Sequence, residues 1–232
     1  MMSIIKFFLI LSLTYFLISE NSFSDANNDS TINILNEQSL AAESKGDFSG
    51  AIELHKKIYA LQPANYQSLN NIAGLYGKLT KYEDEIIWAN KAIALNPKYS
   101  LAYINLGNAY FSQGLLGAAE KAYVKAISLD PNSAITYYNL GLIADAVKDF
   151  NSSVTFYEKA VELNPKSEEF QISLAIAYAN NRENENVVKT LKKILAMYPN
   201  SEYAKILLLH FTPVKIAPKS KEKSEHAKSN GH

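Results

Sequence analysis

The feature that most constrains this sequence is a proline that returns at a fixed interval. Pro63, Pro97, Pro131, Pro165 and Pro199 follow one another at equal spacing. A constant period of roughly 20–50 residues in a helix-forming sequence is typical of stacked helical pairs, because one pair cannot bury its apolar face alone. The period divides the chain into five copies, at residues 32–65, 66–99, 100–133, 134–167 and 168–201.

The copy at 100–133 shows most clearly how one unit folds. Apolar residues recur three or four positions apart between Tyr103 and Tyr110, and again between Ala119 and Ile127, which predicts two amphipathic helices. Gly114 lies between them, and glycine readily adopts the left-handed backbone that closes a helix. Each copy is therefore expected to be a helix, a tight turn, a second helix and a turn at the proline.

Equivalent positions in successive copies form columns of small residues. Small side chains allow two helix backbones to approach closely, so these columns predict tight packing within and between copies. The column on the first helix is Ala73, Gly107, Gly141 and Ala175, the column that it should meet on the second helix is Ala51, Ala119, Ser153 and Val187, and a third column, facing the following copy, is Ala92, Ala126 and Ala160.

These columns, together with the segment NLGNAY at 105–110 and the closing LNP and LDP triplets, resemble the tetratricopeptide repeat family. The resemblance covers residues 32–201. It implies an all-α fold, a right-handed superhelical solenoid of tandem helix-turn-helix repeats whose first helices line the concave side. Residues 202–212 are expected to form a capping helix, because an array needs its last apolar face covered.

Two places depart from the family pattern. Glu85 stands where the second-helix column calls for a small residue; its stem is expected to lie along Ala73 with the carboxylate reaching water. Gln38 and Ser39 replace the apolar and small residues expected in the first copy, which fits a terminal repeat that faces solvent.

The segment at 1–26 has the three regions of a secretory signal peptide. Lys6 precedes an uncharged apolar run from Phe7 to Ile18, and small and polar residues follow, with cleavage expected after Ser24 or Ala26. The alternative is an uncleaved membrane anchor, although the apolar run is shorter than the roughly 20 residues that span a bilayer. Residues 27–31 are expected to form a short linker. The chain is thus expected to be exported, to a bacterial periplasm or the exterior.

Composition excludes several classes of protein. The formal net charge is zero, with 23 basic and 23 acidic residues, which argues against a protein that coats nucleic acid or an anionic membrane. The chain has no cysteine, so disulfides, thiolate metal sites and a lipid-modified amino-terminal cysteine are excluded. Residues 213–232 are polar and rich in lysine, and we expect them to be a disordered tail.

A candidate peptide-binding groove follows from the positions next to the packing columns. Asn71, Asn105 and Asn139 occupy equivalent positions in successive copies and should form a ladder of amides along the inner face, able to bond the backbone of an extended peptide. The alternative is that these amides bond neighbouring helices. The same inner side is expected to carry Asn108, Ile104, Phe111, Tyr138, Leu142 and Ile172, unless neighbouring copies cover most of this apolar surface.

The charge of the groove indicates what it can hold. Its charges are few, mainly Asp145 and Glu169. The family that this chain resembles suggests one mode of binding. Its chaperone-binding members bind a C-terminal carboxylate with lysine and arginine side chains on the first helices. No cation stands at the matching positions, so a carboxylate would gain no charge-assisted bonds. A neutral or mildly basic, partly apolar segment is the better match. The matching positions carry Asn70, Asn105, Asn108, Ile135, Asn139, Glu169 and Ser173.

No motif for catalysis is found. The segment GLYGKLT at 74–80 lacks the glycine and the serine or threonine of a phosphate-binding loop, and no two histidines have the spacing of a zinc site. We therefore expect no cofactor, no metal and no specific small molecule. The leading hypothesis is a protein–protein interaction scaffold of the cell envelope that binds a peptide or partner segment in the groove. The alternative is a structural subunit of a secretion or pilus apparatus that uses the convex face or the array ends.

Overall fold

A computed structural model describes residues 28–212, which are helical apart from short turns. The first helices of the five pairs are the helix at 28–44, α3 (Tyr66–Lys78), α5 (Ser100–Ser112), α7 (Ala134–Ala146) and α9 (Glu168–Asn180). The second helices are α2 (Phe48–Leu61), α4 (Tyr82–Leu95), α6 (Leu116–Leu129), α8 (Phe150–Leu163) and α10 (Asn184–Met197), and α11 (Glu202–Phe211) follows the last pair. The predicted signal peptide and tail lie outside the described residues.

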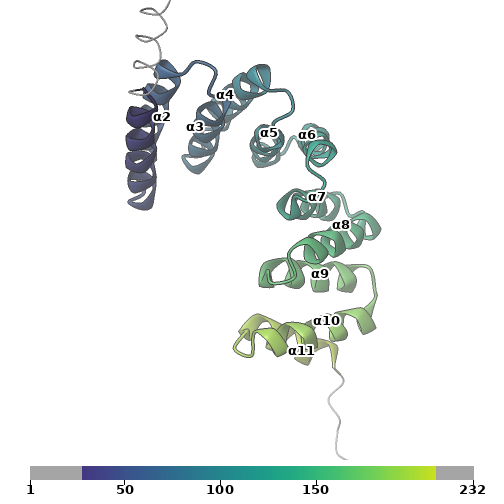
Figure 1. The fold of residues 1–232 in the computed structure, drawn as a ribbon. Coiled ribbons are helices and arrows are strands. Elements are labelled where there is room, and N and C mark those ends of the chain that lie inside the picture. Colours follow the sequence, from purple (N-terminus) through teal and green to yellow (C-terminus); the bar gives the residue numbers. More distant parts are fainter. Residues whose placement is uncertain (1–27, 213–232) are drawn as a thin grey trace, which may run out of the picture.

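The helical pairs stack into an arc, which confirms the all-α solenoid. In Figure 1 the chain curves from α2 round to α11, with α3, α5, α7 and α9 toward the hollow side and α4, α6 and α8 on the outside. Each helix packs mainly on the helices next to it in sequence, with α3 and α5 also in contact. Within residues 28–212 we find no helical segment with the length and hydropathy that a membrane crossing requires.

The five prolines fall at equivalent corners. Each lies in the turn that leads from a second helix to the next first helix. Several of these helices then begin with a side-chain cap, since Asn65, Ser167 and Ser201 accept hydrogen bonds from backbone N–H groups of α3, α9 and α11. The predicted role of the prolines is confirmed.

The tight turn inside each pair also repeats its geometry. Gly46 and Gly114 have φ angles of +77° and +73°, as the sequence predicted for Gly114. Thr80, Lys148 and Arg182 occupy the same position in the other copies, with φ angles of 58°, 61° and 63°. A left-handed conformation at a residue with a Cβ costs about 1–2 kcal/mol, so the fold imposes this turn even where glycine is absent.

The small columns are buried, and the structure shows why two of their members are glycine. A Cβ on Gly107 would lie 2.5 Å from Cε1 of Tyr123, and a Cβ on Gly141 would lie 2.5 Å from Cε1 of Tyr157. In the second copy the first-helix position carries Ala73 and the tyrosine is replaced by Ala89, both fully buried. Glycine therefore stands where a tyrosine ring lies against the helix backbone.

This pairing gives a prediction for Gly107. Replacing Gly107 with alanine should lower the free energy of unfolding by about 1–3 kcal/mol, because the added methyl would overlap the buried Tyr123 ring. Gly117 is a matched control, since a Cβ there would meet nothing within 4 Å, and alanine should stabilise its helix by about 0.5–1 kcal/mol. Urea unfolding followed by circular dichroism measures both; equal effects would contradict the pairing.

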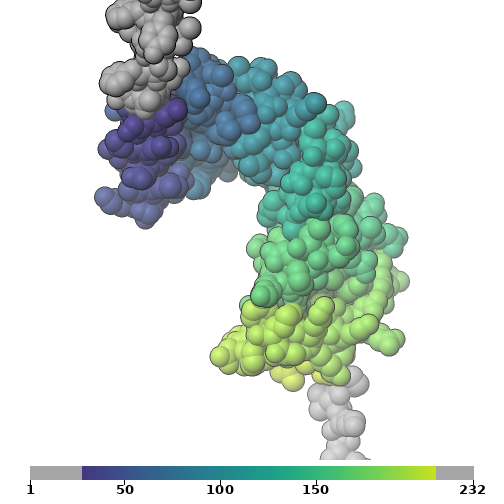
Figure 2. Space-filling view, viewed as in Figure 1, coloured from purple at the N-terminus to yellow at the C-terminus, as the bar shows by residue number. Residues whose placement is uncertain are grey.

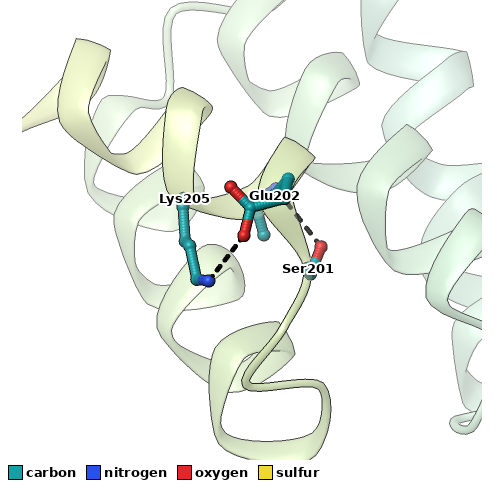
Figure 3. A network of polar contacts seen from close by, with 4 residues as sticks. Ser201, Glu202 and Lys205 are labelled. Atoms are coloured by element: carbon teal, nitrogen blue, oxygen red, sulfur yellow. Dashed lines mark hydrogen bonds and ion pairs between the residues drawn. The ribbon is translucent and has the colours of Figure 1, made fainter.

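Both ends of the described array differ from its middle. Residues 28–31, expected to be part of a linker, instead form the first turn of the helix that continues to residue 44, because asparagine, aspartate, serine and threonine suit a helix start. At the other end, the hydroxyl of Ser201 accepts a hydrogen bond from Ala204 N–H, and Lys205 pairs with Glu202 at 2.7 Å (Figure 3). The predicted capping helix is present as α11, which packs on α10.

Candidate functional site

A polar pocket lies on the hollow side of the arc, between the helix at 28–44, α3 and α5. Its volume is about 660 Å³. The space-filling view shows the hollow that the arc encloses (Figure 2). The pocket wall includes the side chains of Glu43, Asn70, Asn71, Lys78, Glu85, Asn105 and Asn108.

The pocket exists because the second copy lacks side chains that the third copy has. Gly74, Gly77 and Ala89 occupy the positions at which the next copy carries Asn108, Phe111 and Tyr123. In the third copy Asn108 accepts a hydrogen bond from the Tyr123 hydroxyl at 2.7 Å, and Phe111 packs against the same core cluster. Removing an amide, a phenyl ring and a phenol ring leaves the space that the pocket occupies.

The Glu85 side chain lies against this space. It is 3% exposed, and its Oε2 atom would be 2.7 Å from a Cβ placed on Gly77. The carboxyl therefore reaches water only through the pocket, and the rest of the side chain is buried. No hydrogen-bond donor within residues 28–212 contacts the carboxyl, and burial raises its pKa to about 7.

Two of the three asparagines predicted to form a ladder, Asn105 and Asn139, are each paired with another asparagine. Nδ2 of Asn105 donates to the backbone oxygen and to Oδ1 of Asn70, at 3.1 and 2.9 Å. Nδ2 of Asn139 donates to Oδ1 of Asn108 at 3.0 Å. These bonds link neighbouring first helices, as the alternative interpretation expected, and leave Oδ1 of Asn105 and of Asn139 facing away from those partners. Asn71 is exposed on the pocket wall.

The predicted apolar groove residues differ in how much surface they present. Ile104 is 7% exposed and packs in the core with Tyr123, so it presents little surface to a ligand. The Tyr138 ring stacks on Phe170, with centroids 4.8 Å apart. Leu142 and Ile172 are half-buried beside the cluster that contains Tyr157, and Phe111 is half-buried in the third copy.

Carboxylates outnumber cations on this side. The Tyr157 hydroxyl donates to Oδ2 of Asp145 at 2.9 Å, and the Tyr138 hydroxyl donates to Glu169 at 3.0 Å. Burial raises the pKa of both tyrosines, so both remain donors. Oδ1 of Asp145 is buried without a hydrogen-bond partner. Lys78 is the lysine of the pocket wall.

Lys78 is already paired. Its ammonium lies 2.9 Å from Oε2 of Glu43 and 5.2 Å from the centre of the Phe48 ring. The described part of the chain holds no group of three or more histidine, aspartate or glutamate side chains arranged for a metal ion. The hollow side therefore combines amides, aromatic rings and several carboxyl groups, of which Glu85, Asp145 and Glu169 form no salt bridge within residues 28–212.

Sequence reasoning did not find the pocket. Glu85 departs from the small column, but the signal for a cavity is Ala89, which stands where the later copies carry Tyr123 and Tyr157. A glutamate in the small column, beside an alanine in the tyrosine column and two glycines on the facing helix, indicates a cavity with a carboxyl in it.

Comparisons with known proteins agree with the repeat architecture. Family models described as tetratricopeptide repeat match residues 66–99, 88–121 and 134–167, and one described as TPR repeat matches residues 107–144. The small glutamine-rich tetratricopeptide repeat-containing protein 2 of Mycosarcoma maydis is 33% identical over 84 residues, which are 36% of this chain and 24% of that protein. The chain thus matches about a quarter of that curated relative.

Solved structures match over more of the chain. A crystal structure of MamA protein has a TM-score of 0.60 and 28% identity, covering 75% of this chain and 96% of the MamA chain. The structure of PilF from Pseudomonas aeruginosa has a TM-score of 0.70 and 16% identity, covering 80% of this chain and 84% of PilF. The PilF likeness concerns the fold alone.

Proposed function

Because this chain is a tetratricopeptide repeat protein, we propose that it is a non-enzymatic protein–protein interaction scaffold of the cell envelope. It holds a peptide or partner segment along the hollow side of the arc. The similarity to other tetratricopeptide repeat proteins supports the scaffold, and the side chains of the hollow side support the choice of this face.

The observation that carries the proposal is the chemistry of that face. The row of first helices that carries the amide oxygens of Asn105 and Asn139 also carries the half-buried ring of Tyr138, which stacks on the buried Phe170. Amide oxygens bond backbone N–H groups, and aromatic rings bury apolar side chains. Glu85 and Asp145 add carboxyl groups that form no salt bridge within residues 28–212. The segment that fits is extended, partly apolar, and neutral or basic.

Substituting both ladder asparagines tests the groove. Changing Asn105 and Asn139 to alanine together should weaken binding of a purified partner about tenfold, since each lost hydrogen bond contributes about 0.5–1.5 kcal/mol. The partner is first identified by mass spectrometry of material captured from the envelope fraction, and affinity is then measured by calorimetry. Asn90→Ala is the matched control, because Asn90 is exposed on α4 and bonds only within its helix.

The two substitutions also remove bonds between helices, so stability is measured in parallel. Helicity and unfolding temperature of the double variant establish that the array is folded at the assay temperature. A folded double variant that binds the partner as tightly as the unchanged chain would contradict the groove proposal. An equal loss of partner binding in the Asn90→Ala control would contradict the proposal as well.

The envelope location rests on residues 1–26. A chain exported through a signal peptide begins after Ser24 or Ala26 in cells. Amino-terminal sequencing of the protein from the envelope fraction tests this, and a chain that begins at Met1 in the cytosolic fraction would contradict it.

A second candidate function is favoured by the end of the array. On α11 the side chains of Tyr203, Ile206 and Leu209 are 51%, 64% and 74% exposed, which suits contact with another subunit of an envelope assembly. Crosslinks in cells that map to α11 or to the second helices, and not to the groove, would favour this structural role, for example in a secretion or pilus apparatus.

A further inference from the structure

The pocket in the second copy contains a buried carboxyl that the fold itself does not use. Glu85 is 3% exposed and lines the pocket, and no hydrogen bond to its carboxyl comes from residues 28–212. Burying a carboxylate without a partner is unfavourable, and evolution of a stable array alone favours the small residue found in this column at Ala51 and Ala119. A glutamate here is explained if a ligand supplies the partner.

The charged groups that line the pocket leave the negative charge of Glu85 without a paired cation. From the helix at 28–44 comes Glu43, and from α3 comes Lys78, which pairs with Glu43. Tyr82 of α4 lines the pocket and Tyr123 of α6 lies close enough to interact with Glu85. From α5 come the neutral side chains of Asn105, Asn108 and Ser112.

Asn105 provides a second acceptor with a defined orientation. Its Nδ2 atom faces the backbone oxygen of Asn70, which can only accept, so the amide is held in one orientation and its Oδ1 atom remains an acceptor. The Asn105 amide also lies beside Gly74, with Oδ1 3.8 Å from the position of a Cβ there. A carboxylate and an amide oxygen on the wall of one pocket form a site for hydrogen-bond donors that carry positive charge.

We propose that this pocket binds the ammonium group of a lysine side chain on the segment that the groove holds, with Glu85 as its counter-ion and Oδ1 of Asn105 as a second acceptor. The inference rests on the proposed function, and it names the side chain that the groove recognises. An ammonium group has three donors on a flexible apolar stem, and a pocket of about 660 Å³ has room for the whole lysine side chain. An anion would face the Glu85 charge without a free cation to bind.

Two small probes test the ammonium site. Nα-acetyl-lysine methylamide and Nα-acetyl-norleucine methylamide have similar side-chain lengths, but only the first carries charge. In NMR titrations of the purified chain at pH 8, the lysine probe should shift the backbone amides of Gly74 and Gly77, and the norleucine probe should not. Because the pKa of Glu85 is about 7, binding should be about tenfold weaker at pH 6, where the carboxyl is mostly protonated.

Variants locate the effect. Glu85→Gln should weaken lysine-probe binding about tenfold or more, and Glu83→Gln should leave it unchanged, since Glu83 is exposed in the same turn of α4. The triple variant Ala73→Gly, Glu85→Ala, Ala89→Tyr gives the second copy the glycine, alanine and tyrosine of the third copy and places a ring beside the pocket, so it should not bind the probe. Equal binding of the norleucine probe, or unchanged binding by Glu85→Gln, would overturn the proposal.

A third arm separates this inference from the function on which it rests. A capped peptide Ala-Ala-Lys-Ala-Ala should bind more tightly than n-butylammonium, because its backbone also meets the groove. Equal affinities would overturn the assignment to a peptide side chain and would count against the groove, even though the ammonium pocket itself was occupied. Tight peptide binding that Glu85→Gln does not change would retain the groove and overturn the lysine assignment.

Discussion

Replacing Tyr157 with alanine should lower the free energy of unfolding by about 3–5 kcal/mol, the range observed when a large buried aromatic side chain is removed. The Tyr157 ring is fully buried and lies against the backbone at Gly141, so its removal leaves a cavity in the core. Urea unfolding monitored by circular dichroism measures the change.

Two further variants separate the ring from its hydroxyl. Tyr157→Phe keeps the ring and removes the hydrogen bond to Asp145, so it should lose only about 1–3 kcal/mol. Tyr203→Ala is the matched control, since Tyr203 is 51% exposed on α11 and its loss should change stability by about 0.5 kcal/mol or less. Similar losses for Tyr157→Ala and Tyr203→Ala would show that the ring does not support the core as described.

Replacing Glu85 with glutamine should remove a pH dependence of stability worth about 3 kcal/mol. Burial raises the pKa of Glu85 from its ordinary value of 4.5 to about 7, and each pKa unit corresponds to about 1.36 kcal/mol. The folded protein prefers the protonated form. The stability associated with that proton is fully present below pH 4.5 and is lost as the pH rises through about 7.

Thermal unfolding of both chains between pH 4 and pH 8 measures this effect. The stability of Glu85→Gln relative to the unchanged chain should increase by about 3 kcal/mol across that range. Burial lowers the pKa of His55, but His55 is present in both chains and its contribution cancels in the difference. Glu83→Gln serves as the control, with no such pH-dependent gain. A constant difference between the unchanged chain and Glu85→Gln would contradict the burial of an unpartnered carboxyl.

The architecture could be predicted from the sequence because the same structural signals recur in each copy. The corner prolines, the left-handed turn at Gly114 and the small columns each follow from backbone rules that act in every copy, so weak signals from the separate copies reinforce one another. Thr80 shows the limit of this reasoning. Its left-handed backbone could not be read from a threonine, and it follows only from the position that Thr80 shares with Gly46 and Gly114.

The pocket could not be predicted in the same way, because it arises where the repetition fails. Its shape depends on which side chains are missing from one copy, and on where Glu85 lies once Ala89 leaves space. The asparagine pairs pose a related problem. The sequence places Asn105 and Asn139 on one face. Their bonds to Asn70 and Asn108 depend on the distance between neighbouring first helices, and the sequence of a single copy does not determine that distance.

The contacts between neighbouring helical pairs determine how far unfolding spreads from a damaged copy. Since helices pack mainly on those next to them in the chain, damage in one copy removes support from its immediate neighbours and from little else. A destabilising substitution in the middle of the array should therefore leave two shorter helical segments, one on each side of a locally unfolded copy. Limited proteolysis of such a variant would yield two protected fragments that meet at the damaged copy.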